Sequence, residues 1–138
     1  MGPVPVLARP FDEKKKKKRE LSEDAAYEIA LQDHPEWRRA LENDSMPDEI
    51  AGPDGQPMSP RMHLMLHVIV ERQLAADDPK GVVAIAQELA KLGVSHHNIR
   101  HEIGQAVCQQ LWQTMKNKQP FDERQYFADL REIADSHR

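Results

Sequence analysis

Histidine pairs spaced four residues apart are the feature of this sequence that points to chemistry. His63 and His67 form one HxxxH pair, and His97 and His101 form a second. Because a helix advances by about 100° per residue, residues four apart lie within about 40° of each other on its surface. A neutral imidazole offers a nitrogen lone pair, the donor that divalent transition metals bind. Two such pairs on facing helices predict a metal site.

The apolar residues around the pairs predict that both face the protein interior. On a helical wheel Val70 and Leu74 lie within about 20° of His63, and Leu111 and Met115 share the face of the second pair. Buried imidazoles need partners, because a polar group without one is costly to remove from water. A shared metal ion would satisfy all four rings together, and a hydrogen-bonded polar core is the alternative. Both interpretations stay open at this point.

A carboxylate lies one turn beyond the first pair. Glu71 is four residues after His67 and is expected either to donate an oxygen to the metal or to orient a ligand histidine. We predict a mononuclear site between two core helices, holding zinc, iron, manganese or nickel, because imidazole suits these ions better than calcium or magnesium. The predicted ligands are His63, His67, Glu71, His97 and His101.

Several familiar metal sites do not fit. The zinc protease motif needs Glu directly after its first histidine, whereas Leu64 follows His63. A carboxylate-bridged di-iron bundle needs more acidic ligands than this pattern offers. Cys108 is the only cysteine, which excludes a cysteine-based zinc knuckle and an internal disulfide. His34 and Cys108 stay open as additional ligands. No residue is identified as catalytic, and the sequence does not decide whether the protein is an enzyme.

The elements that must position these residues are helices. Ser22, Ser59 and Ser95 stand where helix N-caps belong, and helical periodicity follows each of them. The segment after Ser59 is apolar or histidine at most positions, so we expect it to be the central helix. Asp78 with Pro79 is expected to open a further helix that ends at Gly93.

The overall prediction is an all-α, single-domain helical bundle of about five to six helices. The bundle occupies residues 21–138 and includes an irregular loop at 44–60, where four prolines and two glycines interrupt any regular element. No stretch shows the alternation of a strand.

A basic arm precedes the predicted bundle. The chain has 138 residues and a net charge of −4, yet residues 1–20 hold seven Lys and Arg against three acids. Such dense like charge repels itself, so we expect a disordered arm whose residues Lys14 to Arg19 can contact nucleic acid or another anionic partner. The basic run follows a short apolar stretch, the reverse of a signal peptide, and no segment has the roughly 20 apolar residues of a membrane span. We therefore expect a cytoplasmic protein without a membrane partner.

Four segments together resemble a known family. They are HPEWRRALE (34–42), MHLMLHVIVERQLAADDPKGV (62–82), HHNIRHEIG (96–104) and CQQLW (108–112). Their order is similar to that of a mostly proteobacterial family of unknown function, number 1841, over residues 34–113. The resemblance implies a bacterial protein and no particular activity, and it gives the basic arm no counterpart. The positions it matches are His34, His63, His67, Glu71, Gln73, His97, His101, Cys108 and Trp112.

Two functions compete on this evidence. The first is a metal-binding helical protein whose reaction, if any, is unknown. The second is a non-enzymatic interaction module, with a hydrogen-bonded polar core and a basic arm that contacts nucleic acid, the ribosome or a protein partner. Nothing in the sequence determines the oligomeric state.

Overall fold

Six helices and one short pair of strands form the part of the chain that the structure describes. The computed structural model describes residues 20–51 and 55–138, so the predicted basic arm lies outside the described residues except for Glu20. Its helical content confirms the all-α prediction. The helices are α1 (Glu23–Gln32), α2 (Pro35–Glu42), α3 (Pro60–Ala76), α4 (Val82–Lys91), α5 (His96–Asn117) and α6 (Glu123–Asp135).

The predicted irregular loop contains a feature that the sequence analysis missed. Strand β2 (Ile50–Ala51) pairs antiparallel with β3 (Pro57–Met58), and the partners are Ile50 with Met58 and Ala51 with Pro57. Each strand has two residues, too few to show an alternating pattern. The rest of the described loop is irregular, as its prolines and glycines predict.

The three serine caps occur where the sequence places them. The hydroxyl oxygens of Ser22, Ser59 and Ser95 accept hydrogen bonds from backbone N–H groups three residues later, at 3.1, 3.1 and 3.2 Å. Each bond satisfies one of the N–H groups that the first turn of a helix leaves without a partner. These caps set the starts of α1, α3 and α5.

Helix α4 starts later than predicted. It begins at Val82 with Gly81 as its N-cap residue, and Asp77 Oδ1 accepts hydrogen bonds from Gly81 N–H and Val83 N–H, both at 3.1 Å. Gly81 has φ +109°, a conformation that glycine adopts without steric cost, so the chain turns there before the helix begins.

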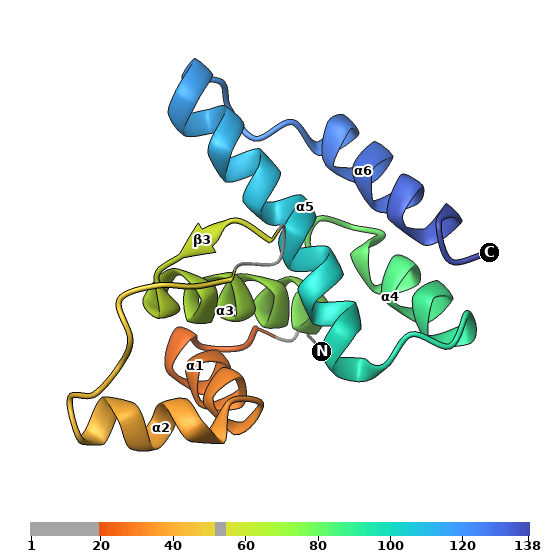
Figure 1. The fold of residues 1–138 in the computed structure, drawn as a ribbon. Coiled ribbons are helices and arrows are strands. Elements are labelled where there is room, and N and C mark those ends of the chain that lie inside the picture. Colours follow the sequence, from red (N-terminus) through yellow and green to blue (C-terminus); the bar gives the residue numbers. More distant parts are fainter. Residues whose placement is uncertain (1–19, 52–54) are drawn as a thin grey trace, which may run out of the picture.

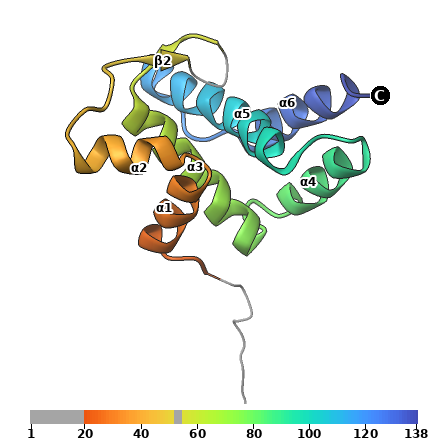
Figure 2. The same ribbon diagram turned by 60° about the horizontal axis from the view of Figure 1, so that its bottom comes forward.

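Helix α3 is central, as its apolar sequence predicts. It packs against α1, α4 and α5 (Figure 1). The turned view in Figure 2 shows α1 and α2 on one side of α3, and α4, α5 and α6 grouped on the other. Among the described residues, none of the helices is both long and apolar enough to cross a membrane.

Helix α3 contributes to two separate hydrophobic clusters. The larger one joins α3 to α4, α5 and α6 around buried residues such as Val70, Ile103 and Leu130. The smaller one joins α3 to α1 through Ala30, Leu31 and Leu64, with residues of α2 packed at its edge. His67 of α3 follows Leu64 of the smaller cluster and Leu66 of the larger one.

Candidate metal centre

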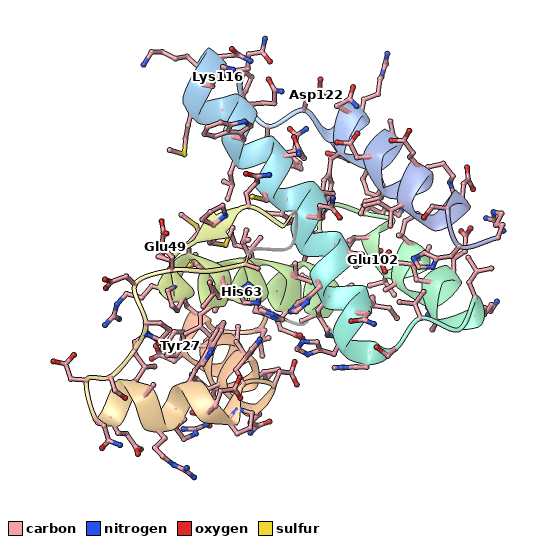
Figure 3. All side chains as sticks on the ribbon, viewed as in Figure 1. Tyr27, Glu49, His63, Glu102, Lys116 and Asp122 are labelled. Atoms are coloured by element: carbon pink, nitrogen blue, oxygen red, sulfur yellow. The ribbon has the colours of Figure 1, made fainter. Side chains whose placement is uncertain are left out.

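Four histidines converge where α3 meets α5 and the junction of α1 with α2. His34, His63, His67 and His101 each bring one ring nitrogen into a group whose members lie within 4.8 Å of one another. His63 and His67 come from α3, His101 from α5, and His34 from the two-residue junction between α1 and α2. In Figure 3 the labelled His63 lies where α3 faces α1 and α5.

The ring of His34 is held from two sides. Its Nδ1 lies 2.9 Å from the carbonyl oxygen of Ala30, and because a carbonyl only accepts, Nδ1 must carry the hydrogen and donate it. Trp37 stacks on the other side, with ring centroids 4.3 Å apart and planes inclined by 15°. This tautomer leaves the Nε2 lone pair of His34 available to a metal ion.

The Nε2 atoms of the other three histidines form a triangle. The distance is 3.1 Å from His63 to His67, 3.1 Å from His67 to His101, and 3.2 Å from His63 to His101. Each nitrogen is thus within contact distance of both others. All three helix-borne rings therefore aim the same atom at one point.

Burial keeps these rings neutral. His63 and His67 are only 4% and 3% exposed, whereas His101 is half-buried. Burial, followed by the nearby histidines, lowers the pKa of His63 to about 4 and that of His67 to about 2, because both effects disfavour the imidazolium ion. Burial also lowers the pKa of His101 to about 4. At neutral pH all three therefore offer lone pairs rather than positive charges.

Two of the predicted ligands lie beside this group rather than in it. His97 packs against His101, with ring centroids 4.2 Å apart, but it is not one of the four converging residues. Glu71 is buried and its Oε2 accepts a hydrogen bond from Arg100 Nε at 2.7 Å, which makes an ion pair between α3 and α5. The pair leaves Glu71 less free to act as a ligand than its spacing suggests.

The remaining candidates have other surroundings. Cys108 is partly buried and packs against the larger hydrophobic cluster, and it is outside the converging group. His96 is exposed at the start of α5. His34, which the sequence leaves open, belongs to the group. The structure therefore brings together three of the four paired histidines, and the fourth member of the group comes from the α1–α2 junction.

Sequence reasoning missed two residues that shape the site. Trp37 orients His34, and the signal for it is present in the HPEW segment, since a residue three positions after His34 lies on the adjacent turn. Arg100 pairs with Glu71, but a helical wheel of one helix cannot show which residue of another helix meets it.

Three buried polar atoms at or near the site have no hydrogen-bond partner among the described residues. They are His63 Nδ1, His67 Nδ1 and Asp33 Oδ2. Most buried polar atoms in folded proteins are satisfied, so a group of exceptions calls for an explanation. The two Nδ1 atoms belong to rings whose Nε2 atoms form the triangle, so the described side chains leave one nitrogen of each of these two rings without a partner.

The comparisons with known proteins give one finding. Residues 9–132 match the family model described as "Domain of unknown function (DUF1841)". No curated protein and no solved structure matches the chain. The match confirms the resemblance and extends it, because it also covers Lys14 to Arg19, for which the motifs alone gave no counterpart. A run of similar charges carries too little pattern to be recognised by motif.

Proposed function

The chain belongs to the DUF1841 family, and because that family's description states no activity, we propose a function from the site itself: the protein binds one divalent transition-metal ion. In this proposal the Nε2 atoms of His63, His67 and His101 are the primary ligands, and His34 Nε2 is the fourth. His97 and Glu71 are not ligands in this proposal. His97 packs against the ring of His101, and Glu71 makes an ion pair with Arg100.

The nitrogen triangle is the observation that carries the proposal. A ring nitrogen either has a hydrogen and donates or has a lone pair and accepts, so it cannot do both. With three nitrogens and two states, at least one of the three contacts must join two donors or two acceptors. Hydrogen bonds alone therefore cannot satisfy all three contacts. One metal ion can, because it accepts all three lone pairs at once.

The spacing of the triangle also suits an ion. Zinc binds histidine nitrogen at about 2.0–2.1 Å in tetrahedral geometry, which separates neighbouring nitrogens by about 3.3 Å. The observed separations of 3.1 to 3.2 Å are close to that value. Four imidazole nitrogens without sulfur favour zinc, iron or nickel, whereas manganese, the fourth predicted ion, prefers oxygen ligands. These arguments support a single ion, since the four rings surround one point.

The test uses untagged protein and two histidine variants of matched chemistry. Elemental analysis after loading with zinc should give about one equivalent in the wild type, and a zinc titration should yield a single binding step. His67→Ala removes one corner of the triangle and should weaken zinc binding at least about tenfold, in line with the loss of a ligand. His96→Ala removes an exposed histidine from α5 and should leave binding unchanged.

Two results would reject the proposal. One is a wild-type protein that retains well below one equivalent of zinc, iron, manganese and nickel after loading under reducing conditions without chelator. The other is an equal loss of affinity in His67→Ala and His96→Ala, since general surface binding would depend on both. Either result would favour the hydrogen-bonded polar core.

A further inference from the structure

A polar cavity lies between α5 and α6, apart from the histidine group. Its volume is about 520 Å³, within the range of about 300–1,000 Å³ that ligand sites occupy. One face of α5, one face of α6 and the segment that joins the two helices line it (Figure 1). In Figure 3 the labelled Asp122, one of the lining residues, lies where the joining segment meets α6. None of the proposed metal ligands belongs to this lining, so the cavity is a separate feature.

Amide and carboxylate side chains dominate the lining. Gln105, Gln109 and Gln113 recur every four residues along α5 and therefore share one face of that helix. The carboxylates of the lining are Asp122, Asp129 and Glu132. None of these three acids forms an ion pair with a described Lys, Arg or His, and none of the described lining residues is basic. The cavity therefore has negative charge that the described side chains do not neutralise.

A buried glutamine adds a hydrogen-bond donor to this cavity. Gln110 is a lining residue and is only 5% exposed. Its Oε1 accepts a hydrogen bond from the backbone N–H of Asp122 at 2.9 Å, but no described residue accepts a hydrogen bond from its amide nitrogen. Buried polar side chains nearly always have a partner. An unused donor at the wall of a cavity therefore indicates a ligand that supplies an acceptor such as a carbonyl oxygen.

We propose that this cavity binds an extended basic peptide segment of a partner protein. Asp129 and Glu132 lie on successive turns of α6, where their carboxylates bind the charged group of a lysine or arginine side chain. Asp129 is already oriented for this, because its Oδ1 accepts a hydrogen bond from Gln125 Nε2 at 2.9 Å. A backbone carbonyl of the peptide accepts the hydrogen of the Gln110 amide, and peptide N–H groups donate to the other glutamine side chains.

Two other ligand chemistries fit this lining less well. A phosphate-bearing ligand would meet three carboxylates and no described cation, so like charges would repel it. A fully protonated polyamine would satisfy the carboxylates but has no acceptor for the amide nitrogen of Gln110. A basic peptide satisfies both requirements with one molecule, because it has cationic side chains and backbone carbonyls.

The experiment is a calorimetric titration of the full-length protein with a capped peptide in which arginine alternates with glycine. Binding should saturate at one site and should be the same with zinc and with chelator, because the metal ligands lie elsewhere. The comparison peptide has citrulline in place of arginine, which retains the shape and removes the charge. It should bind at least about tenfold more weakly, as expected for the loss of a hydrogen bond to a charged group.

Three variants test the lining. Asp129→Asn and Glu132→Gln each remove one charge and should each weaken binding of the arginine peptide by about tenfold. Asp129→Asn retains an oxygen for the bond from Gln125, and Glu132 is exposed, so both variants should melt like the wild type. The matched control is Glu123→Gln, which removes an exposed charge from the first turn of α6 outside the lining and should bind like the wild type.

The side-chain amide signal of Gln110 in a nitrogen–proton NMR spectrum gives a second readout. The arginine peptide should shift this signal, whereas spermidine, which has no carbonyl, should leave it in place. The proposal would be overturned by an arginine peptide that shows no saturable binding, by equal affinity for the citrulline peptide, or by an unmoved Gln110 signal at saturation. Equal weakening in Glu123→Gln and Asp129→Asn would also overturn it, because general attraction to an acidic surface would then explain the binding. None of these outcomes depends on whether the histidine group binds metal.

Discussion

The hydrogen on one ring nitrogen decides what the other nitrogen can do. In His34 the bond from Nδ1–H to Ala30 fixes the tautomer and directs the Nε2 lone pair to the cluster. In His63 and His67 the Nδ1 atoms have no partner among the described residues. If their Nε2 atoms bind the ion, their Nδ1–H groups are buried donors without acceptors, each costing about 1–3 kcal/mol. The orientation of the His63 and His67 rings is then set by the packing around them rather than by hydrogen bonds to Nδ1.

The ion pair of Glu71 with Arg100 gives a prediction about a single residue. Both side chains are largely buried, at 8% and 15% exposed, so Glu71→Gln leaves the Arg100 charge in the interior without its partner. We expect the free energy of unfolding to fall by about 3 kcal/mol, while zinc affinity falls less than in His67→Ala. Chemical denaturation of the metal-free protein and a zinc titration measure the two effects.

The surface pair of Glu28 with Arg38 is the matched control for that prediction. These side chains are 52% and 41% exposed, so Glu28→Gln should leave the denaturation midpoint nearly unchanged, because exposed pairs contribute little. If Glu71→Gln instead abolished zinc binding while stability stayed the same, Glu71 would be a ligand, and its pairing with Arg100 would be secondary.

The helices of this protein differ in how firmly packing holds them. Helix α3 has eight buried residues, whereas α2 has none and packs through the partly buried Trp37 and Leu41. Helix stability in proteins comes mostly from the burial of an apolar face, so α2 is the least secured of the six described helices. Its N-cap is His34, the proposed fourth ligand. A metal ion would therefore fix α2 at the end where packing is weakest.

Hydrogen exchange should reveal this dependence at the scale of the helix. In the metal-free protein the amides of α2 should exchange faster than those of α3 and α5, because local opening exposes little apolar surface. Zinc should slow exchange in α2 by about tenfold or more, and His34→Ala should remove that gain even where the other three histidines still bind zinc. Helix α6 supplies no ligand and serves as the internal control. Equal protection of α2 and α6 by zinc would contradict the prediction.

The sequence predicts features that depend on one helix and misses those that depend on two. The Ser22, Ser59 and Ser95 caps and the two HxxxH pairs follow from local spacing, because a cap or a helix face is set within a few residues. The ion pair of Glu71 with Arg100 and the position of His34 in the histidine group depend on how the helices cross. Crossing angles follow from the packing of whole surfaces, which periodicity does not encode. The predicted start of α4 at Asp78 and Pro79 was wrong for a local reason: the chain turns at Gly81, which has φ +109°, and the helix begins only after it.

At the scale of the whole molecule, the candidate site has ligands from helices that belong to two separate hydrophobic clusters. The smaller hydrophobic cluster joins α1 to α3, and the larger one joins α3 to α4, α5 and α6. A metal ion held by His34, His67 and His101 would cross-link the α1–α2 junction to both α3 and α5. Binding of a ligand to the folded state alone stabilises that state by mass action, so the whole fold should respond to metal.

The metal-free protein should lose stability in acid, and the sign follows from the lowered histidine pKa values. An unfolded chain binds a proton at each histidine near pH 6.5, whereas in the folded state the pKa of His63 and of His101 is about 4 and that of His67 about 2. Between pH 6.5 and about 4 the unfolded chain therefore holds more protons. The contribution of these neutral rings to stability is complete above pH 6.5 and is lost as the pH falls below it. A polar core without metal would show the same trend, so acid sensitivity alone does not identify a metal site.

Metal and protons compete for the same nitrogens, and that competition gives a prediction that only the metal site makes. At pH 7.5, zinc at 100 times its dissociation constant should stabilise the fold by about 2.7 kcal/mol, a rise of about 10 °C in melting temperature. The rise should be similar at pH 5, because folded-state pKa values of about 4 for His63 and His101 and about 2 for His67 keep the three rings neutral there. It should shrink only as the pH falls below about 4, where protons compete with zinc for these nitrogens. Thermal melts with zinc and with chelator at both pH values measure these shifts in the wild type, His101→Ala and His96→Ala. The zinc-dependent rise should vanish in His101→Ala and persist in His96→Ala, whose exposed ring lies outside the group. A wild-type melting temperature that neither zinc nor chelator changes at pH 7.5 would contradict the metal site, since the neutral rings would then satisfy one another without an ion.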